Sequence, residues 1–73
     1  LNHTLGMTFY DYINRYRVEE ACRIIESMVD NDRINMEEVS RQAGFNSVST
    51  FNRHFRKVKG TTPIDYFKRA VMS

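Results

Sequence analysis

The chain has 73 residues, a formal net charge of +2 and a single cysteine, Cys22. A chain this short forms one small domain or part of one, and it buries only about 60% of its unfolded surface. One cysteine excludes a fold held by internal disulfides, and no run approaches the ~18 apolar residues of a membrane span. We therefore expect a small domain whose cysteine is a free thiol and which makes no membrane contact. Because the chain begins with Leu1 rather than Met, we expect a piece of a longer protein.

Charge is divided unevenly along the sequence. Residues 1–38 hold four arginines and eight acidic residues, a net charge of −4, whereas residues 39–73 hold seven basic residues and Asp65 alone, a net charge of +6. A basic half of this kind favours a polyanionic partner, although a solvated basic face is the ordinary alternative.

A long helix is predicted over residues 8–30, after a segment, residues 1–6, that reads as the end of a preceding helix. Thr8 is a favourable N-cap, with Asp11 placed to complete a capping box. Apolar residues at three- and four-residue steps predict one apolar stripe along the helix: Phe9, Tyr12, Ile13, Tyr16, Ala21, Ile24, Ile25 and Met28. The polar side is predicted to hold Asn14, Arg15, Glu19, Glu20, Arg23 and Glu26, with Glu19 and Arg23 as an ion pair.

A helix-turn-helix is predicted over residues 35–59. Asn35 caps the first helix with Glu38 as its reciprocal partner, and Gly44 ends it. Ser47 caps the second helix, which runs from residue 48 to 59 and ends at Gly60. The inward residues of the first helix are Met36, Val39 and Ala43.

A short C-terminal helix is predicted over residues 62–72. Thr62 caps it, Pro63 takes its first position and Asp65 closes the capping box. Ile64, Phe67 and Val71 are expected to face inward. Because no alternating strand pattern or internal repeat occurs, the chain is predicted to be all-α.

The helix over residues 48–59 divides cleanly when its residues are placed about 100° apart. One flank is apolar: Val48, Phe51, Phe55 and Val58. The opposite face is polar and basic: Ser49, Asn52, Arg53, Arg56 and Lys57. His54 falls between the two and is expected at the surface. The helix contains no acidic residue.

These side chains suit the major groove of DNA. Arginine can donate twice to guanine, and asparagine can pair in the same way with adenine. Since such helices read bases with their first turns, we predict that Ser49, Asn52 and Arg53 contact base edges, with Val48 at a thymine methyl. The phosphate contacts are predicted to be Ser47, Arg56 and Lys57. A merely solvated polar face is the alternative interpretation.

The string AGFNSVSTFNRHFRKVKGTTPIDY, residues 43–66, resembles the C-terminal DNA-binding domain of the AraC/XylS family of bacterial transcription regulators. The likeness lies in the Gly-Phe pair, the capping serine, the aromatic, the arginine and phenylalanine that follow, the basic pair, the glycine and Thr-Pro. YINRYRVEEA, residues 12–21, resembles the helix that joins this family's two helix-turn-helix units. One departure is Ser40, where the family usually has alanine.

The resemblance implies a homeodomain-like helix-turn-helix, residues 35–59, preceded by a long linker helix, residues 8–30, and followed by a short C-terminal helix. Residues 1–73 would be one DNA-binding domain fragment, in which residues 1–6 end the first unit's recognition helix and the rest of that unit is missing. Val48, Ser49, Asn52 and Arg53 match the family's base-facing positions. Double-stranded DNA is the implied partner, RNA polymerase a further candidate, and the bacterial cytoplasm the implied location.

An enzyme is not expected, because the cysteine, histidines and acids show neither nucleophile–base nor metal-ligand spacing. No cofactor or metal is predicted. The rival hypothesis is a helical protein-interaction module that docks through Phe9, Tyr12 and Tyr16. This stripe is expected to be exposed through the loss of its neighbours and partly covered by self-association.

Overall fold

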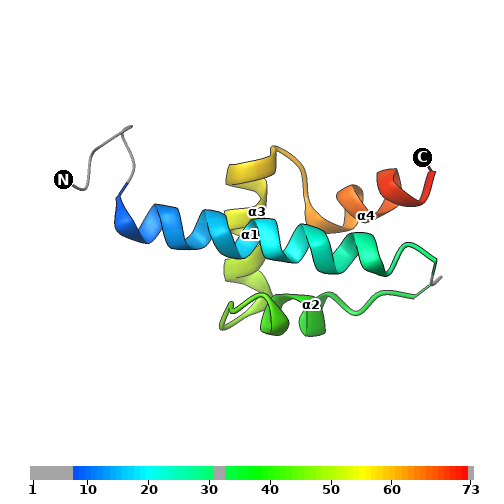
Figure 1. Ribbon diagram of the computed structural model, residues 1–73, viewed down its shortest axis with the longest axis horizontal. Helices are drawn as coiled ribbons and strands as arrows, with labels where there is room; N and C mark the ends of the chain where they lie inside the picture. The colour runs from blue at the N-terminus through cyan, green and yellow to red at the C-terminus, as the bar shows by residue number, and fades with distance from the viewer. Residues whose placement is uncertain (1–7, 31–32, 73) are drawn as a thin grey trace.

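The computed structural model describes residues 8–30 and 33–72, and all regular structure in that part of the chain is helical. The predicted all-α fold is therefore confirmed. The helices are α1 (Phe9–Ser27), α2 (Met36–Gln42), α3 (Val48–Lys59) and α4 (Pro63–Met72). Each of the other helices contacts α1. Figure 1 shows α1 along the length of the molecule with α3 crossing it steeply. The expected helix end at residues 1–6 lies outside the described residues.

The four predicted N-caps are confirmed. Thr8 Oγ1 accepts a hydrogen bond from the Asp11 amide (3.0 Å), and Ser47 Oγ accepts one from the Thr50 amide (3.2 Å). Asn35 Oδ1 accepts two, from the amides of residues 37 and 38, and Thr62 Oγ1 accepts one from the amide of residue 65. These bonds satisfy amides that the first turn of a helix leaves without partners.

The reciprocal half of the capping boxes is not formed. The Glu38 carboxylate instead bonds Arg41 and Gln42, three and four positions along the same helix. The Asp11 carboxylate lies 3.9 Å from Lys57 Nζ on α3. Both carboxylates face cationic or amide donors that compete with the backbone amide of the cap, so the prediction for Glu38 and Asp11 was wrong.

Gly44 sets the sharp turn between α2 and α3. Its φ of +101° is a left-handed conformation that side chains other than glycine's rarely adopt. A Cβ atom at this position would also lie 3.3 Å from Arg17 Nε on α1. The predicted helix stop is thus confirmed, and the structure adds a second reason for glycine, since α1 approaches the turn closely.

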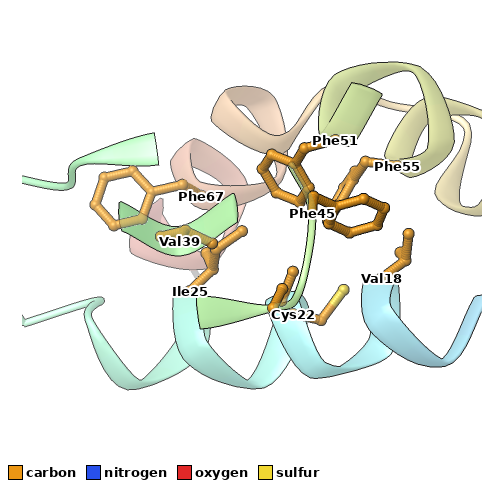
Figure 2. Close-up of a cluster of buried hydrophobic side chains, with 10 residues drawn as sticks. Val18, Cys22, Ile25, Val39, Phe45, Phe51, Phe55 and Phe67 are labelled. Atoms are coloured by element: carbon orange, nitrogen blue, oxygen red, sulfur yellow. The ribbon is translucent and has the colours of Figure 1, made fainter. Parts of the chain in front are cut away.

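The core is one apolar cluster drawn from all four helices and the turn (Figure 2). Its buried members are Val18, Ala21, Cys22, Ile25, Val39, Ala43, Phe45, Phe51, Phe55 and Phe67. The ring centroids of Phe51 and Phe55 lie 5.6 Å apart in an edge-to-face arrangement, and that of Phe45 lies 5.4 Å from Phe51. The predicted apolar flank of α3 therefore provides the centre of the core.

The apolar residues predicted as one stripe of α1 lie on two faces, and the exposure expected for Phe9, Tyr12 and Tyr16 is confirmed. Phe9, Tyr12 and Tyr16 are exposed by 71%, 59% and 60%, whereas Asn14 and Val18 are buried. The three aromatic residues lie about 160–220° around an ideal helix from Asn14. They therefore point away from the side of α1 that packs on the core. Asn14 tolerates burial because its Nδ2 donates to the Tyr10 carbonyl (3.0 Å).

Ion pairing on α1 and the inner face of α4 also differ from prediction. Arg23 pairs with Glu20, while the Glu19 carboxylate accepts from Lys59 Nζ at 3.1 Å. On α4, Phe67 is buried as expected but Ile64 and Val71 are exposed. Around α4, Pro63 and Tyr66 lie on one side of Phe67 and pack on the core. Ile64 and Val71 lie on its other side.

Candidate nucleic-acid interface

Helix α3 presents a continuous polar face to solvent because Phe51 and Phe55 hold its opposite side in the core. Ser49, Asn52 and Arg53 are exposed on that face. Arg56 and Lys57, one turn further on, are also exposed. Val48 is half-buried, between this face and the apolar flank. All the residues predicted to contact DNA therefore remain accessible in full or in part.

The predicted residues border shallow hollows along α3. One hollow is lined by Asn52, Arg53, Arg56, Lys57 and Gly60. A second, at the start of the helix, includes Ser47, Val48 and Ser49. Two predicted base-reading residues thus share a hollow with two predicted phosphate-binding residues, while the other three predicted residues gather at the N-terminus of α3.

Electrostatic neighbours divide the cations of α3 into two groups. Lys59 Nζ lies 3.1 Å from both carboxylate oxygens of Glu19, and Lys57 Nζ lies 3.9 Å from Asp11 Oδ1. In the described part of the chain, no hydrogen bond or ion pair engages the side chains of Asn52, Arg53 or Arg56. These three side chains are therefore open to a partner, whereas Lys59 already neutralises an acid of α1.

His54 is not at the surface, contrary to the prediction. Only 9% of its area is exposed, and its ring lies 5.9 Å from the rings of both Tyr10 and Phe45. The helical projection leaves His54 on the boundary between the two flanks. Its burial is decided by the start of α1, whose position over α3 no local pattern reveals.

Four residues that were not predicted to contact DNA also border hollows along α3. Arg41 and Asn46 line the hollow at the start of α3 together with Ser47. Thr62 and Pro63 line a third hollow with Asn52 and Arg56. The only local signal was that Asn46 directly precedes the N-cap of α3, because the other three residues reach the face through the packing of α2 and α4.

Among residues 8–30 and 33–72, no helix is long and apolar enough to cross a membrane. No group of three or more histidine, cysteine, aspartate or glutamate side chains in those same ranges is arranged to hold a metal ion.

The fold and the acid-free face of α3 define a helix-turn-helix of the DNA-binding class. The sequence matches the family described as "Helix-turn-helix domain" over residues 1–69. The chain belongs to this AraC-type helix-turn-helix family of transcription regulators, which confirms the resemblance seen in the sequence.

Curated relatives support this membership. The chain is 30% identical over 66 residues to the transcriptional regulatory protein HptR of Staphylococcus aureus (strain NCTC 8325 / PS 47), covering 90% of this chain and 24% of HptR. It is 29% identical, with the same coverage, to an uncharacterized response regulatory protein of Staphylococcus epidermidis. The chain thus spans about a quarter of the length of these relatives. No solved structure gives a significant match.

Proposed function

We propose that the chain binds double-stranded DNA sequence-specifically by placing α3 in the major groove. The observation that carries this proposal is the exposed, acid-free face on which Asn52 and Arg53 have no partner in the described part of the chain. Asparagine and arginine are side chains that read adenine and guanine through paired hydrogen bonds. Burial of Phe51 and Phe55 fixes which side of α3 faces outward.

Within this proposal the residues have separate roles. Ser49, Asn52 and Arg53 read base edges, and the half-buried Val48 contacts a thymine methyl group. Arg56, Lys57 and Ser47 contact phosphates, which position the helix without reading sequence. The Ser47 hydroxyl donates to Thr50 Oγ1 (3.1 Å) and would release this bond to reach a phosphate.

The length of α1 suits a linker between two reading units. Its 19 residues at about 1.5 Å each span about 28 Å, close to the ~34 Å between successive faces of the major groove. We propose that the chain is part of a larger DNA-binding domain, with a first helix-turn-helix before α1. The names of the relatives, a transcriptional regulatory protein and a response regulatory protein, favour a bacterial transcription regulator. The bacterial cytoplasm is proposed as its location and RNA polymerase as a further partner.

The salt dependence of DNA binding tests this proposal. Arg56 and Lys57, by neutralising two phosphates, should give a slope of about −1.8 for log affinity against log salt, or a roughly 12-fold loss between 50 and 200 mM salt. Fluorescence anisotropy with a labelled duplex measures it. Arg56→Gln should reduce the slope by about 0.9, whereas Arg15→Gln, an exposed arginine of α1, is the matched control and should leave it unchanged. An affinity that does not respond to salt would argue against groove binding.

The exposed aromatic residues of α1 support a second candidate function, protein docking. Phe9, Tyr12 and Tyr16 lie opposite the core face of α1, and we propose that a second copy of the chain covers them. Sedimentation equilibrium should then show dimers that Tyr12→Lys and Tyr16→Lys dissociate without unfolding. A monomer at all concentrations would exclude this surface as a self-association site.

A further inference from the structure

His54 closes the joint at which α1, the turn and α3 meet. Its ring stacks on Phe45 of the turn with an interplanar angle of 21°, and it meets Tyr10 of α1 edge-on at 72°. The side chain is on α3 directly beside Arg53, whose own side chain points to the proposed DNA face. The imidazole therefore packs behind the residues that would read bases.

This position is unusual for a polar group. His54 Nε2 is enclosed, and it has no hydrogen-bond partner among the described residues. Buried polar atoms are normally paired, because leaving one unpaired carries a desolvation cost. A protonated imidazole carries an N–H donor on each ring nitrogen, and each donor needs an acceptor. Because Nε2 has no partner, a protonated ring fits this joint worse than a neutral one.

The charges that face His54 oppose protonation further. Arg53 and Lys57 on α3 and Arg17 on α1 repel a positive ring, and Asp11 on α1 is the acid that attracts it. The Asp11 carboxylate already lies near Lys57 Nζ. Burial first, and then Arg53 and Lys57, lower the pKa of His54 below its ordinary value of 6.5.

We propose that His54 is a positioning residue that holds α3 against α1 and the turn only while its imidazole is neutral, so that acid loosens this joint. The inference rests on the proposed function for the importance of α3. Its test needs no DNA, so that failure of DNA binding and failure of the acid-sensitive joint are separate results.

The direction of the effect follows from linkage. The unfolded chain takes up a proton at His54 near pH 6.5, whereas the folded chain does so only at a lower pH. The stability that neutral His54 supports is complete above about pH 6.5. It is lost as pH falls through that value toward the folded pKa, because the unfolded state then binds more protons.

The experiment compares wild type with His54→Phe in urea unfolding followed by circular dichroism between pH 8 and pH 5. Phenylalanine keeps a ring between Tyr10 and Phe45 but cannot be protonated. The unfolding constant of wild type, divided by that of His54→Phe, should rise as pH falls below about 6.5, by up to tenfold per pH unit. His3 and all carboxylates occur in both proteins and cancel in this ratio. A ratio that stays constant with pH would overturn the proposal.

A second measurement does not depend on the variant folding. In a proton NMR titration of wild type, the His54 ring should titrate below pH 6.5, and the Tyr10 and Phe45 ring signals should shift with it. Asp11→Asn should lower the pKa of His54 further, because the attracting carboxylate is gone. A His54 ring that titrates at or above pH 6.5, or without its two ring neighbours, would show that protonation does not act on this joint.

Discussion

Phe51→Ala should unfold the chain under conditions in which the wild type is folded. The Phe51 side chain is fully buried and lies in ring contact with Phe45 and Phe55, so its removal leaves a cavity at the centre of the core. Truncations of this kind cost about 3–5 kcal/mol. A native domain is stable by roughly 0.05–0.15 kcal/mol per residue, or about 4–11 kcal/mol for 73 residues. The expected loss is therefore between about a third of the free energy of unfolding and all of it.

Urea unfolding followed by circular dichroism measures this loss. Phe9→Ala is the matched control, because it is the same chemical change at a position that is 71% exposed on α1. The control should change the free energy of unfolding by no more than about 0.5 kcal/mol. Similar losses for the two variants would mean that the apolar flank of α3 is not the centre of the core.

The sequence predicted best those features that depend on residues close together in the chain. The Thr8, Asn35, Ser47 and Thr62 caps each bond an amide two or three positions away, so they follow from local chemistry alone. The left-handed conformation of Gly44 is also local. These signals determine where each helix begins and where the turn lies, and they led to the correct all-α fold.

The failures concern which helix packs on which. Glu19 pairs with Lys59, 40 positions away, although Arg23 is nearer in the sequence. Asn14 is buried because it shares one side of α1 with Val18, Ala21, Cys22 and Ile25. These residues recur at helical spacing, but the aromatic residues on the opposite side form a competing apolar stripe in the sequence. His54 became part of the interior because the start of α1 lies over it. Such choices depend on the relative placement of α1 and α3, which a local pattern does not contain.

The candidate site was more predictable than the packing around it. Helix α3 is strongly amphipathic, so the positions of Phe51 and Phe55 alone predict that Asn52 and Arg53 face solvent. The proximity of Asp11 to Lys57 could not be predicted, since it again requires α1 to lie across α3. The local pattern thus identifies the reading face, while the acids at its edge come from the tertiary fold.

Arg53→Ala should weaken binding to the preferred DNA sequence by about 1–3 kcal/mol and relax the preference at one base pair. The preferred sequence is first selected from a pool of random duplexes with the wild-type chain. Arg53 is exposed and has no partner in the described part of the chain, so its loss should leave the free energy of unfolding nearly unchanged. Anisotropy titrations on selected and random duplexes measure both affinity and preference.

Lys57→Ala is the comparison that separates reading from positioning. Lys57, like Arg53, is exposed, but it lies one turn further from the start of α3, where such helices meet phosphates. A phosphate contact carries no sequence information, so Lys57→Ala should weaken binding to selected and random duplexes about equally. Because the Lys57 amine already lies 3.9 Å from Asp11, part of its charge is offset, and its loss should cost less than that of Arg53 on the selected sequence. Equal losses on the two duplexes for Arg53→Ala would remove Arg53 from the base-reading set and leave it as a second phosphate contact.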